Sequence, residues 1–524
     1  MSDRRPRPGT LFVVVLLVAA GTATGATVAS PGEAASWAPA ADATAAPTAP
    51  QQDRPVVRQV GIVSRNDEPG SISLTFEYRI PPSVEGLRVG VPVASISGVT
   101  VESMDGFERT ETTRFLWDTG TARPTVTFRL AVTDSLSGGV RGVERGDWAL
   151  ASEPNTRVQV RADQRPVRID TFEVASDEPG YARSHLAYLG PHERRNVTVA
   201  DERATYVLGA ENVDIERSAA FLRTANRHFD FGIHHDTVTV FVLPLGEEDT
   251  EGVEAATVDT AFWVGETDLQ FERTGSVFAH EYVHTRLGTV GTGSAAWLTE
   301  ATAEYYGRLF AFNDGVGTYD AFLDGLRATN YTADRRSVTL AEPDTWRGTT
   351  AHYAKGAHVL AALDAEIQRR TGGERTLRDV FEGRTEPFPN YRAFRLAVVQ
   401  VAGDDIGPWL DRYVLGDALP PLPEEPRYYV AAPSLDPDGD GMASGAELDA
   451  GRHPFVAGPG PDRSTPTATP TATESPTPSP TTTPTGTDAT ATTREGTAGD
   501  APGFGAVAGL LAVILVGLWL REEG

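Results

Sequence analysis

The sequence predicts a multidomain α+β protein, in which an N-terminal β-sandwich at residues 55–174 precedes a mostly α-helical domain at residues 175–425. In the first part, short runs of alternating apolar and polar residues, such as 71–78 and 125–130, are separated by Gly, Pro and Asp turns, which is typical of strands. From Phe271 onward, helical spacing of apolar residues dominates. Strands followed by helices, without an internal repeat, favour an α+β architecture over a repeat or propeller.

The start of the chain predicts an export signal. Residues 1–30 contain a basic start, an apolar run and then small residues, which is the usual layout of such a signal. A buried helix is the alternative interpretation. The pair Arg4 and Arg5 suggests twin-arginine export, but nearby prolines interrupt that pattern, so the export route stays open. Residues 31–54 are rich in Ala, Thr and Pro and indicate a linker.

The other end predicts a stalk and an anchor. Residues 457–501 are rich in Thr and Pro and indicate an extended, O-glycosylated stalk. In residues 502–524, a Pro-Gly-Phe tripeptide precedes a short apolar run and Arg521. This tail resembles the PGF-type sorting signals that archaeosortases are thought to cleave and replace with a lipid. An ordinary C-terminal anchor helix is the alternative, and both place the protein at the outer face of the cell membrane. N-glycosylation sequons at Asn196 and Asn330 agree with export.

The composition excludes several function classes. The chain has 46 basic and 72 acidic residues and a net charge of −26, so it lacks the basic surface that nucleic-acid binding requires. It has no cysteine, which excludes disulfide scaffolds, thiolate metal sites and cysteine nucleophiles. Its only lysine is Lys355. An acidic, nearly lysine-free composition resembles that of proteins from salt-loving archaea, and a GC-rich genome is the alternative explanation.

A zinc-binding motif lies in the helix predicted at residues 276–286. His280 and His284 are four residues apart, so their imidazoles lie on one helical face and can reach one zinc ion. Glu281 lies about 100° around the helix, where its carboxylate can take a proton from a metal-bound water. Core histidines are the alternative, but two buried imidazoles beside a carboxylate would be costly without a metal.

A second predicted helix, at residues 295–310, supplies the third ligand. Catalytic zinc commonly has three protein ligands and leaves its fourth position to water. Glu300 lies sixteen residues after His284 and offers a carboxylate oxygen. Glu304, one turn further, could accept a hydrogen bond from a ligating histidine, and a solvated surface acid is its alternative role.

These residues resemble the gluzincin metallopeptidases, most nearly the M1 aminopeptidase and M61 glycyl-aminopeptidase-like families. After the histidine motif, these families have Trp-Leu-Asn/Ser-Glu, and this chain has Trp-Leu-Thr-Glu at 297–300. The resemblance implies a thermolysin-like catalytic domain that binds one catalytic Zn²⁺. The Gly-x-Met-Glu-Asn strand, which binds the substrate amino terminus in M1 enzymes, has no clear counterpart, so aminopeptidase and endopeptidase action both remain open.

A later helix, predicted at residues 351–370, strengthens the resemblance. M1 enzymes carry Tyr-Glu-Lys-Gly-Ala there, and this chain has Tyr-Ala-Lys-Gly-Ala at 353–357. In the family the tyrosine stabilises the oxyanion, which implies the same role for Tyr353, and a phenol can make that contribution without adding charge. A helix-packing aromatic is its alternative role. Because Lys355 is the only lysine and matches the family position, we expect it to pair a carboxylate beneath the site, and chance survival of a single lysine is the alternative.

Residues 426–456 contain a predicted calcium loop that would stiffen the neck before the stalk. Its spacing fits a twelve-residue EF-hand loop with oxygen ligands and a glycine at the sharp turn, and an acidic loop without a metal is the alternative. The segment before it does not predict an entering helix, so it resembles a lone dockerin-like loop. The predicted ligands of one structural Ca²⁺ are Asp436, Asp438, Asp440, Met442, Ser444 and Glu447.

Together these features predict an exported, surface-anchored zinc metallopeptidase that hydrolyses peptides or proteins. The predicted ligands are His280, His284 and Glu300, with Glu281 and Tyr353 as catalytic residues. A processing enzyme of the archaeosortase type is the expected partner of the tail. The alternative from another class is a non-catalytic surface or adhesion protein that keeps the gluzincin fold, and the intact set of zinc ligands argues against it.

Overall fold

The computed structural model describes residues 55–95, 97–132, 142–162, 167–200, 202–228, 231–245, 255–270, 274–327, 338–429, 440–452, 454 and 458. The predicted export signal, linker and sorting tail, and all of the predicted stalk except Gly458, lie outside these residues. The described residues up to Tyr429 belong to one compact unit and those from Asp440 onward to a second. Within the described part of the chain, no helix is both long and apolar enough to cross a bilayer.

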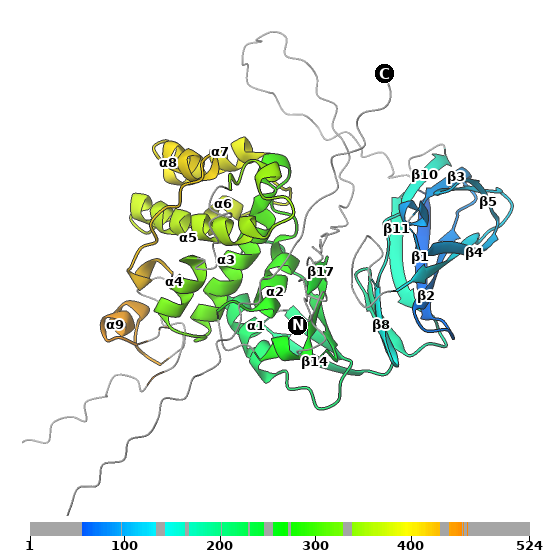
Figure 1. Ribbon diagram of the computed structural model, residues 1–524, viewed down its shortest axis with the longest axis horizontal. Coiled ribbons are helices and arrows are strands. Elements are labelled where there is room, and N and C mark those ends of the chain that lie inside the picture. Colours follow the sequence, from blue (N-terminus) through cyan, green and yellow to red (C-terminus); the bar gives the residue numbers. More distant parts are fainter. Residues whose placement is uncertain are drawn as a thin grey trace, which may run out of the picture. The chain divides into compact units, whose positions relative to one another are not determined.

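The N-terminal part of the first unit is β-rich and contains two sheets with a shared core (Figure 1). Their strands are β1 (Val56–Arg65), β2 (Ser71–Arg79), β3 (Val84–Gly90), β4 (Val99–Asp105), β5 (Phe107–Glu111), β6 (Arg114–Trp117), β7 (Thr125–Ala131), β10 (Arg157–Ala162) and β11 (Val167–Val174). One sheet has the order β11-β1-β2-β7-β4 and the other β10-β3-β6-β5. Alternate residues of β2, such as Leu74 and Phe76, are buried in the core, as period-two alternation predicts.

A third sheet contributes to two different cores. It has the order β12-β13-β9-β8 and is built from β8 (Gly142–Arg145), β9 (Trp148–Ser152), β12 (Gly180–Arg183) and β13 (Leu186–Leu189). One face, with Ala149 and Ala187, packs into the core of the first two sheets. The opposite face, with Leu150 and Tyr188, packs into a second core shared with the next sheet. The β-rich part therefore extends past residue 174 to Leu189.

A fourth sheet underlies the helices. Its order is β14-β15-β16-β18-β17, with β14 (Glu193–Val199), β15 (Glu202–Leu208), β16 (Thr237–Leu243), β17 (Ala256–Val258) and β18 (Ala261–Gly265). Helix α1 (Glu216–His228) connects the parallel strands β15 and β16. Val240 and Val242 on one face of β16 belong to the helical core, whereas Phe241 on the other face belongs to the core shared with the third sheet. Strand β17 lies at one edge of this sheet and pairs antiparallel with β18.

Helices α2 (Val277–Leu287), α3 (Trp297–Asn313) and α5 (Ala351–Thr371) confirm the helices predicted at 276–286, 295–310 and 351–370. In Figure 1, α2 and α5 both lie against α3. The helix α2 begins after Ser276, whose hydroxyl accepts a hydrogen bond from the Ala279 amide. The remaining helices of the unit that the structure describes are α4 (Tyr319–Arg327), α6 (Arg378–Phe381), α7 (Tyr391–Ala402) and α8 (Ile406–Val414).

Two glycines allow these helices to approach closely. A Cβ atom on Gly307 of α3 would lie 3.1 Å from the backbone nitrogen of His280 on α2. A Cβ atom on Gly356 of α5 would clash with the side chain of Ala301 on α3. The backbone of each helix is therefore in van der Waals contact with the next, which brings the neighbourhoods of His280, Glu300 and Tyr353 together.

We predict that Gly356→Ala destabilises the protein. Alanine should gain up to about 1 kcal/mol of helix propensity, but overpacking at a closed contact costs about 1–3 kcal/mol. Thermal unfolding should therefore begin at a lower temperature than in the wild type. The double variant Ala301→Gly/Gly356→Ala removes the clash with Ala301 at a cost of about 1 kcal/mol of helix propensity in α3, and it should regain part of the loss. Equal stability of the single variant and the wild type would contradict the close contact.

Lys355 joins α5 to two distant segments. Its side chain is fully buried, and its Nζ donates hydrogen bonds to the carbonyl oxygens of Val338, at 2.5 Å, and Gly416, at 2.7 Å. The prediction that Lys355 pairs with a carboxylate is therefore wrong, because backbone carbonyl oxygens accept the hydrogen bonds of its ammonium group. Burial lowers the pKa of Lys355 to about 8, although the nearby charge of Asp417 acts in the opposite direction.

The burial of Lys355 predicts that the free energy of unfolding depends on pH. Because the pKa of Lys355 is lower in the folded chain than its ordinary value of 10.5, the unfolded chain binds the proton more tightly between about pH 8 and 10.5. The free energy of unfolding of the wild type should rise across this range, by at most about 3 kcal/mol, relative to Lys355→Met. Denaturant unfolding at several pH values measures the difference, and parallel pH curves would contradict it.

Candidate metal centre

Three donor atoms from α2 and α3 converge on one point. His280 Nε2 lies 3.1 Å from His284 Nε2, and Glu300 Oε2 lies 3.3 Å from each of them. Ligands 2.0–2.1 Å from a tetrahedral zinc ion are about 3.3 Å apart, so the triangle has the size that zinc requires. The three residues form the one cluster of metal-binding side chains found among the described residues. The structure thus brings the three predicted ligands together.

Thr299, the residue before Glu300, fixes the loop that leads into α3. Thr299 is buried, and its hydroxyl accepts hydrogen bonds from the backbone amides of Val290, at 3.1 Å, and Gly291, at 3.4 Å. These amides belong to the loop that connects α2 to α3. Threonine at this position therefore ties the loop to the first turn of α3 and sets where the Glu300 carboxylate meets the histidines.

A polar relay orients the His280 ring. Glu304 Oε2 lies 3.3 Å from His280 Nδ1, and its other carboxylate oxygen accepts hydrogen bonds from Arg308 Nε, at 2.8 Å, and Nη2, at 2.5 Å. This contact makes Nδ1 the hydrogen-bond donor and leaves Nε2 for a metal. Gly275 and Gly325 leave room for the guanidinium, because a Cβ on either would lie within 2.7 Å of Arg308 Nη1.

The charges at the centre favour a cation. Burial raises the pKa of Glu300, but the charges of His284 and His280 and their hydrogen bonds outweigh it and hold that pKa well below its usual value. Burial lowers the pKa of His280, yet its hydrogen bonds with Glu300 and Glu304 prevail and raise it to about 10. Buried carboxylates thus hold a positive charge at this point, which a divalent metal ion would provide in place of the proton.

Glu281 is held by a strand residue. It is 7% exposed, and its carboxylate Oε2 accepts a hydrogen bond of 2.7 Å from the hydroxyl of Thr257 on edge strand β17. Helix α2 packs against this strand. Sequence reasoning missed Thr257, since a threonine in a three-residue strand carries no signal that it faces a particular glutamate.

An aromatic column connects Tyr353 to the centre. The Tyr353 ring stacks on the His280 ring, with centroids 5.8 Å apart and an interplanar angle of 10°. His352 contacts Tyr353 edge-on and stacks on the buried Trp346 at 4.1 Å. Burial lowers the pKa of His352 to about 4, so its imidazole is neutral at physiological pH. Sequence reasoning selected Tyr353 but missed the two residues that pack behind it.

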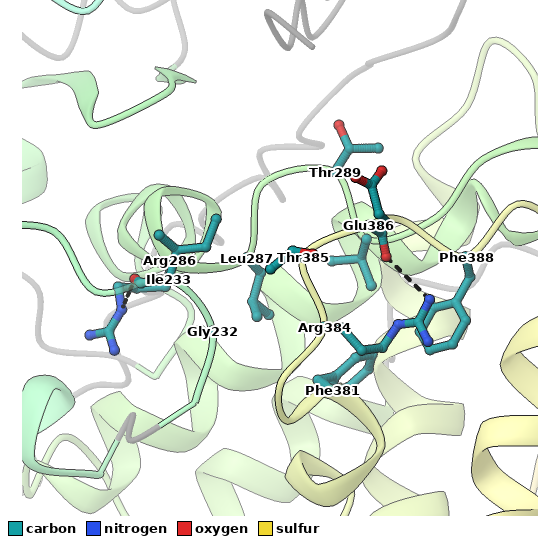
Figure 2. Close-up of a pocket in the computed structure, with 11 residues that line it drawn as sticks. Gly232, Ile233, Arg286, Leu287, Thr289, Phe381, Arg384, Thr385, Glu386 and Phe388 are labelled. Carbon is teal, nitrogen blue, oxygen red and sulfur yellow. Dashed lines mark hydrogen bonds between the residues drawn. The ribbon is translucent and has the colours of Figure 1, made fainter. Parts of the chain in front are cut away.

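A small pocket lies at the C-terminal end of α2 (Figure 2). Arg286 and Leu287 line it together with residues 384–386, and the Arg384 guanidinium covers the Phe388 ring at 3.8 Å. Its volume of about 40 Å³ has room for water. The pocket begins within one turn of His284, but none of the predicted site residues lines it.

The calcium loop is described only from Asp440 onward. Asp436 and Asp438 lie outside the described residues. Asp440 accepts a hydrogen bond of 2.8 Å from the Met442 amide, and Gly441 has a φ of 91°, as a sharp turn requires. Ser444 is the first residue of α9 (Ser444–Asp449), and the same helix carries the buried Glu447. Calcium binding stays a prediction.

We predict that Arg308→Met weakens zinc binding without unfolding the protein. Loss of the guanidinium releases Glu304, and loss of a group that orients a ligand typically costs about 10–100-fold in metal affinity. Titration against a competing chelator measures the affinity. Arg370→Met is the matched control, because Arg370 makes the same i,i+4 ion pair, with Glu366 on α5. Equal zinc affinities of the two variants would contradict the relay.

Comparison with known proteins gives a likeness of fold. The chain has no significant match among protein-family models or curated proteins. An aminopeptidase N family protein from Idiomarina loihiensis is similar in structure with a TM-score of 0.53 and 13% identity, over 70% of this chain and 77% of that one. An M1 zinc metallopeptidase from Deinococcus radiodurans follows with a TM-score of 0.45 and 20% identity, over 71% and 95% of the two chains. Legionella pneumophila aminopeptidase A has a TM-score of 0.42 and 12% identity, over 69% and 49%. The chain therefore shares the multidomain α+β fold of an aminopeptidase N family protein.

Proposed function

We propose that the protein is a zinc-dependent peptidase. The observation that carries the proposal is the triangle of His280, His284 and Glu300, two of them buried, with Glu281 on the same helix and Tyr353 stacked against His280. A carboxylate and two imidazoles leave one position of a tetrahedral zinc ion open, as in catalytic rather than structural sites. The fold shared with an aminopeptidase N family protein supports the same reaction class.

The residues divide the work of peptide hydrolysis. A zinc ion bound here would supply Lewis acidity to the substrate carbonyl and to the attacking water. Glu281 takes the proton of that water and passes it to the leaving amine. The Tyr353 hydroxyl donates a hydrogen bond to the oxygen on which negative charge develops. Glu304 and Arg308 keep His280 in the orientation in which Nε2 faces the metal.

The position of cleavage within a peptide stays open. The structural neighbour belongs to an aminopeptidase family, and an exopeptidase that removes amino-terminal residues would follow that pattern. Among the described residues, strand β17 is a sheet edge beside α2, and such an edge can add an extended peptide by backbone hydrogen bonds without recognising a terminus. This observation favours endopeptidase action as the second candidate.

The proposal is tested with Glu281→Gln in buffer of molar salt. We expect the wild type to bind one zinc ion and hydrolyse peptides, and the variant to keep its zinc while kcat falls by about 10²–10⁴-fold. Glu342→Gln, at an exposed position, is the matched control and should stay fully active. A panel of free-amine and N-blocked peptides then separates exopeptidase from endopeptidase action.

Two results would overturn the proposal. Folded wild-type protein without stoichiometric zinc would remove its basis. Wild-type protein that binds zinc but hydrolyses no peptide of the panel would favour the alternative, a non-catalytic surface or adhesion protein that keeps the metal site.

We also propose that the peptidase acts outside the cell and is anchored at the outer face of the cell membrane. The layout of residues 1–30, the Thr/Pro-rich stalk and the Pro-Gly-Phe tail support this location. A calcium ion bound at the loop before the stalk would stiffen the neck between enzyme and anchor. An archaeosortase-type enzyme would then process the tail.

A further inference from the structure

Thr257 joins the edge of the sheet to Glu281. Its side chain is 6% exposed, and its hydroxyl lies 2.7 Å from Glu281 Oε2 and 3.0 Å from the backbone oxygen of the same residue. Both oxygens belong to Glu281, so the one hydroxyl contacts both the backbone and the side chain of that residue. A hydrogen bond of 2.7 Å between a hydroxyl and a carboxylate is of the short, charge-assisted type.

The hydroxyl is itself held rigidly. Thr257 pairs with Phe262 across the β17–β18 hairpin, and the next residue, Val258, is buried in the core between the third and fourth sheets. A β-branched side chain in a strand has few rotamers. The sheet therefore presents the oxygen at a fixed point, and little conformational entropy is lost when Glu281 binds to it.

Glu281 needs such a fixed point. A free glutamate side chain rotates about three bonds, whereas a general base must keep one carboxylate oxygen within hydrogen-bond distance of the proton that it removes. The Thr257 contact uses Oε2 and leaves Oε1 for the attacking water. A displacement of about 1 Å from the reactive geometry can cost about 10²-fold in rate.

We propose that Thr257 is a positioning residue that holds the Glu281 carboxylate in its working orientation. The inference rests on the proposed peptidase function and deepens it, because it assigns part of the catalytic geometry to the sheet edge rather than to the zinc-binding helices. It predicts that removal of the hydroxyl lowers kcat while KM and zinc affinity stay unchanged. A merely structural role, in which Thr257 fastens β17 to α2, predicts instead a loss of stability and of zinc.

The test uses two substitutions that differ only in the hydroxyl. Thr257→Val keeps the branched shape and removes the oxygen, whereas Thr257→Ser keeps the oxygen. We expect kcat of Thr257→Val to fall about 10–100-fold, with KM and zinc content within twofold of the wild type, and Thr257→Ser to recover most of the rate. Thr239→Val is the matched control, a fully buried threonine on β16 of the same sheet, and should leave kcat unchanged.

A double variant shows whether Thr257 acts through Glu281. In Glu281→Asp the carboxylate is one methylene shorter and should no longer reach the hydroxyl, so adding Thr257→Val should cause little further loss. Wild-type kcat in Thr257→Val, losses that multiply in the double variant, or a fall in zinc affinity would each overturn the inference. An active wild type with any of these results refutes only the role of Thr257, whereas an inactive wild type refutes the peptidase function and this inference with it.

Discussion

Two histidine nitrogens and the buried carboxylate of Glu300 lie within 3.3 Å of one another, and positive charge between them stabilises this arrangement, which shapes much of the helical part. A cation at this point offsets the cost of burying the Glu300 carboxylate. Helices α2 and α3 must then lie close enough for side chains on both to share one ion. Gly307, against the backbone of His280, supplies the clearance for that approach.

Contacts around the three candidate ligands connect them to other parts of the helical region. Thr299 fastens the connecting loop, Glu304 and Arg308 orient one imidazole, and the aromatic column behind Tyr353 connects α5 to the same ring. Each contact joins groups with defined partners, so each limits a different motion of the residues at the centre. Such preorganisation is what a metal site requires if the metal is to keep one position open for chemistry.

The residues of the candidate metal centre could be predicted from the sequence because their information is local. A four-residue spacing fixes two imidazoles on one helical face, and the Trp-Leu-Thr-Glu run identifies Glu300 on the next helix. Thr257, Arg308 and His352 could not be predicted, because their roles depend on how separate elements pack. A specific role for Lys355 could be expected from its singular occurrence, but its partners could not, because the carbonyls that hold it lie 17 and 61 residues away along the chain.

The third sheet limits where the chain can be divided. Its strands β9 and β13, which pair with each other, come from opposite sides of residue 174, and alternate residues of both serve different cores. A recombinant fragment that began at residue 175 would keep β12 but lose β9, so Leu186 and Tyr188 would lose one of the two strands that flank them. A cut on the N-terminal side of Gly142 would instead separate β10 and β11 from their partners β3 and β1. The β-rich part and the helical part therefore have to be expressed as one piece, because neither position divides the chain between independent domains.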